Sequence, residues 1–230
     1  MIGIIGAMEE EVTKLKEQMI NVTVLKKACM EFYSGLLEGK EVVVVRSGIG
    51  KVNAALCTQI LCDDYHVTTI INTGIAGSLD NKIEIGDIVL STDALQHDVD
   101  AVAFGYELGV IPRMETSIFM ADEMLCSLAK SVCERVNPDI QVFTGRIVSG
   151  DQFIADKAVK DRLIQYFQPL CTEMEGAAIA QAAYLNQVPF LIVRAISDKA
   201  DNSAELDYPT FEAKAIEHTV KLMTALVAAL

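Results

Sequence analysis

The sequence lacks an excess of positive charge. Its 19 lysines and arginines are outnumbered by 32 aspartates and glutamates, which gives a formal net charge of -13. Proteins that bind nucleic acids or anionic membranes through electrostatics need basic patches on their surface. We therefore expect neither a nucleic-acid partner nor a membrane partner.

The sequence also contains no long apolar segment and no paired cysteines, and its first residues predict no leader peptide. No stretch reaches the roughly 18 consecutive apolar residues of a membrane span, and Met1 leads into a short apolar run that soon meets glutamates, unlike a signal peptide. The 6 cysteines form no CxxC pair. His97, Asp98 and Asp100 are the one candidate metal cluster, but a second histidine is missing nearby. We expect a cytoplasmic protein with reduced thiols, no metal and no cofactor.

Two nucleotide-binding signatures are incomplete. Gly3 and Gly6 do not have the GxGxxG spacing, and the stretch 48–53 begins correctly but has Asn53 where the third glycine belongs. A P-loop would need a glycine at Val45. These departures argue against a Rossmann oxidoreductase and a P-loop NTPase.

What the sequence does contain is an alternation of short β-branched runs and helical patterns. Predicted strands span 1–7, 41–48, 67–74, 86–92, 146–150 and 190–197, and predicted helices span 9–19, 51–64, 120–135, 156–166, 175–186 and 209–228, the last opening at Pro209. Runs without polar alternation indicate strands that are buried on both faces. We predict one α/β domain over 1–230, with a mixed, largely parallel sheet flanked by helices.

The segment 29–48 differs from this pattern. Turn signals at Ser34-Gly35 and at Glu38-Gly39 predict a hairpin at the edge of the sheet.

Small and acidic residues follow most of the apolar runs, which predicts a composite pocket at the carboxyl ends of the strands. Glu173 and Glu175 share a face if their segment is extended and diverge if a helix starts at 175, and Glu173 could equally be a structural charge. Asp198 closes a strand, where burial can raise its pKa as a general acid requires.

Three consecutive glutamates, Glu9 to Glu11, follow the first predicted strand. Acidic residues are favourable in the first turn of a helix. Successive helix residues point about 100° apart, so the three carboxylates cannot all face one pocket.

Six ordered motifs together resemble one family. They are GIIGAMEEEV, SGIGKVNAA, INTGIAGSL, SGDQFI, EMEGAAIA and RAISDKAD. The chain resembles, over essentially its whole length, the 5′-methylthioadenosine/S-adenosylhomocysteine nucleosidases of the nucleoside phosphorylase superfamily. The resemblance implies a nucleoside phosphorylase-like fold, hydrolysis of an N-glycosidic bond, a role in methionine salvage and a homodimer.

The resemblance also implies roles for individual residues. Glu11 matches the water-activating carboxylate, Asp198 the acid that protonates adenine at N7, and Glu175 the residue that holds the ribose hydroxyls. Arg194 matches a residue that assists the attacking water. The remaining matches contact the substrate: Met8, Ile49, Ile75, Ala76, Gly77, Phe104, Phe153, Ile154, Met174, Ser197 and Tyr208. Tyr106 and Pro112 match a loop that completes the 5′ pocket of the partner subunit.

The sequence departs from the family pattern at Ile75, where many members have a serine that helps to hold the water. Ala101 stands where a bulkier residue is common. Neither change removes Glu11 or Arg194, so we expect activity to persist.

Three alternatives stay open at this level. Phosphorylases of the superfamily hold phosphate with arginines, but Asn72 stands at one such position and the first loop is acidic, which favours water. A sister hydrolase that acts on futalosine or aminodeoxyfutalosine would use the same acid–base set. A catalytically silent nucleoside-binding protein would share the fold.

Overall fold

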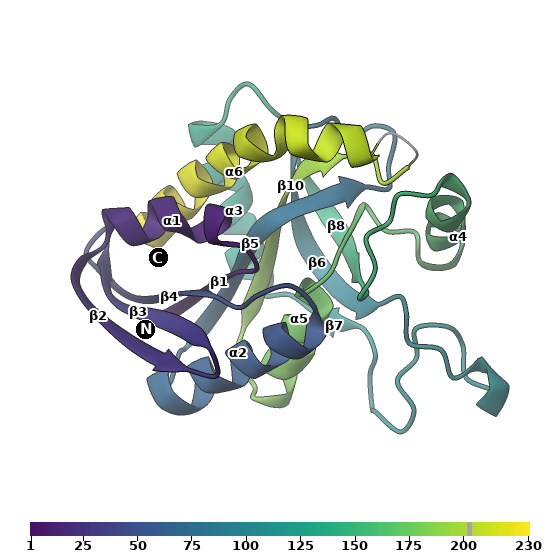
Figure 1. The fold of residues 1–230 in the computed structure, drawn as a ribbon, viewed down its shortest axis with the longest axis horizontal. Helices are drawn as coiled ribbons and strands as arrows, with labels where there is room; N and C mark the ends of the chain where they lie inside the picture. The colour runs from purple at the N-terminus through teal and green to yellow at the C-terminus, as the bar shows by residue number, and fades with distance from the viewer. Residues whose placement is uncertain (202–203) are drawn as a thin grey trace.

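The computed structural model describes residues 1–201 and 204–230 (Figure 1). The strands are β1 (Ile2–Gly6), β2 (Ile20–Lys27), β3 (Met30–Leu37), β4 (Lys40–Arg46), β5 (Thr69–Ser78), β6 (Ile88–Gln96), β7 (Phe119–Met120), β8 (Val142–Ser149), β9 (Cys171–Glu173) and β10 (Phe190–Asp198). The helices are α1 (Glu9–Gln18), α2 (Lys51–Tyr65), α3 (Glu123–Val136), α4 (Lys157–Phe167), α5 (Gly176–Leu185) and α6 (Ala204–Ala229), with a 3₁₀ helix at Val102–Phe104.

The strands form one mixed sheet in the order β10-β6-β8-β9-β5-β1-β4-β3-β2. β1 lies between β4 and β5 and is parallel to both. β5 also pairs in parallel with β10, which itself pairs with β6. Strands β5, β10, β6, β8 and β9 therefore close into a ring, and the ends of β5, β8, β9 and β10 meet at one place.

Helices cover both faces of the sheet, as the unalternated apolar runs predicted. Figure 1 shows α1 and α6 together on one face, with α2 and α5 side by side on the other. Val42 to Val45 on β4 are fully buried, because this strand is covered on both sides. In the part of the chain that the structure describes, no helix has the length and apolarity needed to cross a membrane.

The edge hairpin is present, but two details of its prediction are wrong. Only Glu38-Gly39 forms a turn, whereas Ser34 and Gly35 lie inside β3. A Cβ on Gly35 would come 2.8 Å from the carbonyl oxygen of Ile20, so this glycine permits close approach of a neighbouring strand. That neighbour, β2, was not predicted.

Two helix starts also differ from prediction. α6 begins at Ala204, five residues before the predicted start at Pro209. Residue 120, predicted to start a helix, instead ends β7, and α3 begins at Glu123 after its N-cap Asp122. The Asp122 side chain accepts the N–H of Leu125 at 2.8 Å, which satisfies one of the free donors of the first turn.

Candidate active site

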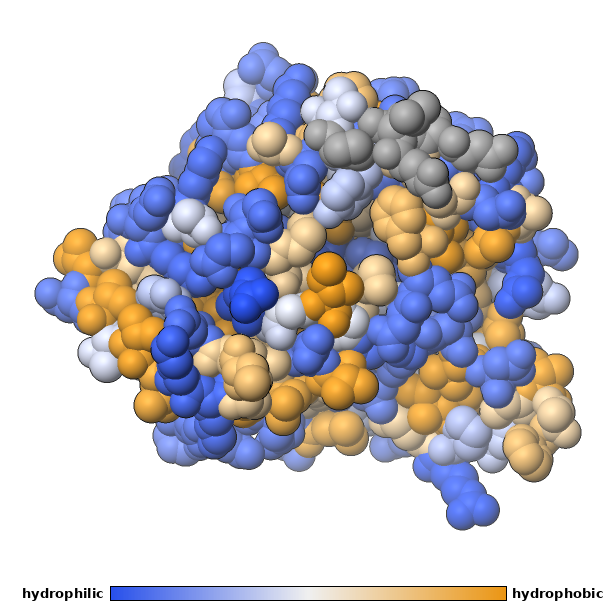
Figure 2. Space-filling view, in the orientation of Figure 1, coloured by the Kyte–Doolittle hydropathy of each residue, from blue (hydrophilic) through white to orange (hydrophobic). Residues whose placement is uncertain are grey.

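A cleft of about 640 Å³ opens where β1, β5, β9 and β10 end. Its lining residues come from seven separate segments of the chain: Ala7, Met8, Glu11, Ile49, Ile75, Ala76, Gly77, Phe153, Thr172, Glu173, Met174, Glu175, Ser197, Asp198 and Tyr208. Figure 2 shows hydrophobic side chains near the middle of this face, among hydrophilic ones. The composite pocket predicted from the strand ends is therefore present.

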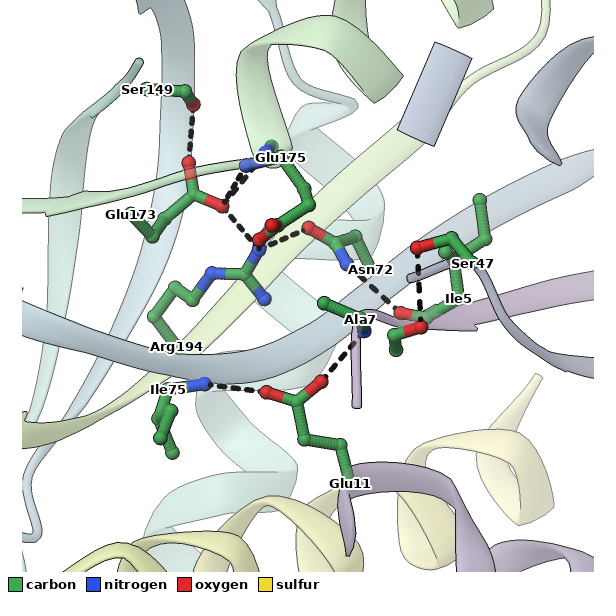
Figure 3. A network of polar contacts seen from close by, with 12 residues as sticks. Ile5, Ala7, Glu11, Ser47, Asn72, Ile75, Ser149, Glu173, Glu175 and Arg194 are labelled. Carbon is green, nitrogen blue, oxygen red and sulfur yellow. Dashed lines mark hydrogen bonds and ion pairs between the residues drawn. The ribbon is translucent and has the colours of Figure 1, made fainter. Parts of the chain in front are cut away.

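Glu11 is the one member of the glutamate triplet that turns into the cleft. Its side chain is 3% exposed, whereas Glu9 and Glu10 are exposed to solvent. The Glu11 carboxylate accepts the N–H of Ala7 at 2.7 Å and that of Met8 at 3.0 Å, which caps α1 from inside. Its other oxygen accepts the N–H of Ile75 at 3.3 Å (Figure 3).

These contacts oppose the effect of burial on Glu11. Burial raises the pKa of the Glu11 carboxyl, while the Arg194 guanidinium and the three backbone N–H groups lower it. Arg194 and Glu11 approach the same point, because a Cβ on Gly74 would lie 2.5 Å from Nη1 of Arg194 and 2.7 Å from Oε1 of Glu11. Gly74 thus leaves room for a carboxylate and a guanidinium side by side.

Arg194 lies beneath the cleft floor, near the middle of β10, and is 1% exposed. Its Nη2 donates to Oδ1 of Asn72 at 2.5 Å and pairs with the Glu173 carboxylate (Figure 3). The same Nη2 is 4.0 Å from the Glu175 carboxylate. One buried cation therefore lies among three buried carboxyl groups: Glu11, Glu173 and Glu175.

Glu173 is a structural acid, which was one of the two readings left open by the sequence. Its carboxylate accepts the N–H of Glu175 at 3.0 Å and that of Gly176 at 2.7 Å, and it also accepts the hydroxyl of Ser149. Burial raises the pKa of Glu173, but the Arg194 guanidinium and these hydrogen bonds hold it below its usual range. Glu173 is thus an anion that anchors the start of α5.

Glu175 diverges from Glu173 because the chain turns into α5 at this residue. Its carboxylate accepts the N–H of Gly50 at 2.8 Å, which connects it to the loop before α2. Burial and the neighbouring Glu173 anion raise the pKa of Glu175 to about 8. Glu175 is therefore mostly protonated at neutral pH.

Asp198 ends β10 at a register shift between Ile196 and Asp198. Its carboxylate accepts the N–H of Ala200 at 2.8 Å and the hydroxyl of Ser197 at 2.9 Å. Burial raises the pKa of Asp198, although both hydrogen bonds oppose the rise. A Cβ on Gly77 would lie 2.7 Å from the Asp198 carboxylate, so Gly77 is needed for this approach.

Glu11 and Asp198 therefore contact β5 three residues apart, at Gly74 and at Gly77. Three residues of extended strand span about 10 Å. Glycosidases that use water directly separate their two carboxyls by about 6.5–9.5 Å. The two points of approach along β5 are therefore separated by a distance of similar size.

Phe153 and Tyr208 form an aromatic wall of the cleft. Their rings meet edge to face with centroids 5.9 Å apart, and Phe153 is 52% exposed. The hydroxyl of Tyr208 donates to the sulfur of Met8 at 3.3 Å. An exposed ring beside a cleft offers a stacking surface to a flat heteroaromatic ligand.

Several predicted residues do not line this cleft. Ile154 is buried beside it in a small cluster with Leu79 and Leu163. Phe104 is 85% exposed on the segment between β6 and β7, which projects from the body of the molecule (Figure 1). Tyr106 lines a second cavity of about 730 Å³, and Pro112 is exposed. Their predicted roles stay predictions.

The site also contains residues that the sequence did not assign to it. Asn72 and Ser149 hold Arg194 and Glu173 in place, and Thr172 lines the cleft. A buried arginine in a strand needs nearby carboxylates, so Arg194 itself was the available signal for Glu173.

The candidate metal cluster is accounted for differently. His97 is 3% exposed, and Asp98 is paired with Lys51 at 2.6 Å. Among residues 1–201 and 204–230, no group of three or more histidine, cysteine or acidic side chains is arranged to hold a metal ion.

Comparison with known families gives the relationship directly. A family model described as the phosphorylase superfamily matches residues 1–228. The chain belongs to this superfamily.

Relatives within the superfamily are close over their whole length. The 5′-methylthioadenosine/S-adenosylhomocysteine nucleosidase of Halalkalibacterium halodurans is 44% identical, with 98% of this chain and 97% of the relative covered. The structure of the corresponding nucleosidase of Neisseria meningitidis, in complex with methylthio-immucillin-A, has a TM-score of 0.95 and 37% identity, with 100% of this chain and 99% of that chain covered. The resemblance drawn from the six motifs is confirmed.

A relative with another name is also similar. The futalosine hydrolase of Helicobacter pylori has a TM-score of 0.94 and 34% identity, with 100% of this chain and 97% of that chain covered. The fold is thus shared by enzymes with different names.

Proposed function

We propose that this chain, as one catalytic domain over 1–230, hydrolyses the N-glycosidic bond of 5′-methylthioadenosine and S-adenosylhomocysteine. The products are adenine and the 5-thio-substituted ribose. One observation carries the proposal: two buried carboxyls, Glu11 and Asp198, face one cleft from positions about 10 Å apart along β5. The names and similarity of the relatives supply the substrate.

In this mechanism Asp198 acts as the general acid. Burial raises the pKa of Asp198, which favours the protonated carboxyl that a general acid needs, and the carboxyl gives its proton to N7 of adenine as the base leaves. The hydroxyl of Ser197 orients the carboxyl. Phe153 stacks on the base, and the backbone of Ile154 reads its edge.

Glu11 acts on the opposite side of the sugar. Bond breaking leaves positive charge on the ribose ring, as in glycoside hydrolysis. The Glu11 carboxylate stabilises this charge and takes a proton from the water that attacks C1′, while Arg194 lies close enough to orient that water. Each such acid–base contribution is worth about 10²–10⁴-fold in rate.

Glu175 holds the ribose hydroxyls from the N-terminus of α5. Met174 packs against the sugar, and Met8, Ile49 and Tyr208 surround the ribose and its 5′ substituent. Ile75, Ala76 and Gly77 supply the cleft floor along β5.

Water is favoured over phosphate as the nucleophile by the charges in the site. The carboxyl groups of Glu11, Glu173 and Glu175 surround the buried cation Arg194, and neutral Asn72 binds that cation. A phosphate dianion placed beside Glu11 would meet strong repulsion in this low-dielectric surrounding.

A second candidate is hydrolysis of futalosine or aminodeoxyfutalosine, which the similarity to the Helicobacter pylori enzyme favours. The same acid and base would serve, because the difference lies in the 5′ group. A silent nucleoside-binding protein is disfavoured, since Glu11, Glu175 and Asp198 are all in place.

The protein is further proposed to be a cytoplasmic homodimer that needs no cofactor. Phe104, Tyr106 and Pro112 lie on the projecting segment between β6 and β7, where they can reach the 5′ pocket of a partner subunit. Apolar side chains on α2 and α5 are exposed on the same side of the sheet: Val52, Leu56 and Leu185. Such a patch is typical of an interface between subunits.

The test is release of adenine, followed by absorbance, from methylthioadenosine, adenosylhomocysteine and aminodeoxyfutalosine. We expect the highest kcat/KM with the first two, and rates that do not depend on added phosphate. Rates that rise with phosphate and yield ribose-1-phosphate would contradict hydrolysis, and a preference for aminodeoxyfutalosine would select the second candidate.

A further inference from the structure

Three loops meet beside the cleft at the side chain of Lys51. The first joins β4 to α2, the second follows β6 and carries Asp98, and the third follows β8 and carries Asp151. Nζ of Lys51 donates to the Asp98 carboxylate at 2.6 Å and to the side-chain carbonyl of Gln96 at 2.9 Å. We call Lys51, Gln96, Asp98 and Asp151 the Lys51 clamp.

The ion pair in the clamp is partly withdrawn from solvent. The side chains of Lys51 and Asp98 are 19% and 16% exposed. Burial raises the pKa of Asp98, but the hydrogen bond and charge of Lys51, together with the N–H of Asp151 and the nearby His97, hold the pKa below its usual range. The second oxygen of Asp98 accepts the N–H of Asp151 at 3.0 Å. Asp98 therefore connects the first loop to the third.

The clamp connects to two different parts of the cleft. The N–H of Lys51 donates to the Asp151 carboxylate at 2.8 Å, and Phe153 follows two residues later. The preceding N–H, that of Gly50, donates to Glu175 at 2.8 Å. The N-terminus of α2 thus contacts both Glu175, which is proposed to hold the sugar, and the loop that carries Phe153.

The conformation of the first loop explains why these contacts matter. Gly48 and Gly50 have φ of +85° and +97°, in a region that L side chains rarely adopt. Glycine has little intrinsic preference among backbone conformations. The direction of the Gly50 N–H is therefore set by what holds the loop at its end, which is Lys51.

We propose that Lys51 and Asp98 are positioning residues that fix the separation between Glu175 and the ring of Phe153. The proposal rests on the proposed nucleosidase function, in which Glu175 holds the sugar and Phe153 stacks on the base. Neither Lys51 nor Asp98 lines the cleft. The clamp affects the turnover of substrates that occupy both ends of the cleft at once, because it sets the distance between Glu175 at one end and Phe153 at the other.

The test compares a ligand that spans both ends of the cleft with one that fills a single end. Lys51→Met removes the ammonium group but keeps the aliphatic stem and the backbone N–H. Because a misplacement of about 1 Å can change rates strongly, we expect kcat/KM for methylthioadenosine to fall about 10- to 100-fold, with the Kd of free adenine within about twofold of wild type.

Two further variants sharpen the result. Asp98→Asn preserves the side-chain volume, and we expect it to lower kcat/KM for methylthioadenosine while the Kd of adenine stays unchanged. The double variant should lose no more kcat/KM than the stronger single variant, because both substitutions break the same ion pair. The matched control is Lys221→Met, which removes an exposed ion pair with Glu217 on α6. It should leave both measurements unchanged.

Each other outcome counts against the clamp. Unchanged turnover in Lys51→Met means that the ion pair positions nothing. Equal losses of turnover and adenine binding, or failure of both Lys51→Met and Asp98→Asn to fold, mean a structural role only. A wild-type protein that binds adenine but releases none from methylthioadenosine contradicts the proposed function instead.

Discussion

Replacement of Glu175 by glutamine should stabilise the protein at alkaline pH and leave it almost unchanged in acid. Glutamine resembles the protonated carboxyl, and its side-chain carbonyl can still accept the N–H of Gly50. It differs from the wild-type side chain in that it cannot ionise. The comparison between the two proteins therefore isolates the free energy of ionising Glu175 beside the Glu173 anion.

The sign and size of the effect follow from the pKa. Below pH 4.5 the Glu175 carboxyl is protonated in both the folded and the unfolded chain. Between pH 4.5 and about 8 the unfolded chain loses this proton and the folded chain retains it, so the free energy of unfolding falls as pH rises. The fall is about 1.4 kcal/mol for each pH unit, or about 5 kcal/mol when complete above pH 8.

The assay is thermal unfolding of both proteins at pH 5 and pH 9, at one protein concentration. A change of 1 kcal/mol shifts Tm by about 2–4 °C in a domain of this size, so Glu175→Gln should gain about 10 °C relative to wild type between the two pH values. Glu41→Gln, at an exposed position on β4, is the control and should show no such gain. A Tm difference between Glu175→Gln and wild type that is the same at both pH values would refute the reasoning.

Three further predictions concern turnover. Glu11→Gln should lower kcat about 10²–10⁴-fold with little change in Tm, whereas Glu9→Gln, on the exposed side of α1, should retain wild-type kcat; equal losses would mean that the triplet has been misassigned. Asp198→Asn should lose a similar factor, and it should also remove the fall in kcat/KM that we expect of wild type as rising pH deprotonates this acid; a pH profile that keeps its alkaline limb would assign that limb elsewhere. Gly74→Ala should lower kcat at least about tenfold, because the new Cβ would lie 2.5 Å from Arg194 and 2.7 Å from Glu11; wild-type kinetics would show that neither group needs its present position.

The fold was predictable where burial alone shaped the sequence. Strands β1, β4, β5 and β10 read as unbroken apolar runs because helices cover both of their faces. The edge strand β2 was missed because it is exposed throughout, including its apolar residues Ile20, Val22 and Leu25. Closure of the ring through β5 and β10 depends on pairings between segments more than 100 residues apart, for which local pattern gives no signal.

The candidate site was predictable for residues that follow strand ends. Glu11, Glu175 and Asp198 each stand where an apolar run stops, and the family motifs assigned their roles. The role of Glu173 was left undecided because it depends on an ion pair with Arg194, and the two residues come together only in the folded chain. The contribution of Asn72 was hidden in the same way, since an amide inside a buried strand carries no sign of its partner.

The way Glu11 is held has a consequence for how this enzyme could change over evolutionary time. All three groups that donate to its carboxylate belong to the main chain, at Ala7, Met8 and Ile75. Side-chain replacement at those positions leaves each N–H in place, so residues 8 and 75 can drift in size and polarity while the carboxylate stays anchored. Recognition of the substrate can then diversify without loss of the chemistry, because residues 8 and 75 line the cleft while only their main chain holds Glu11.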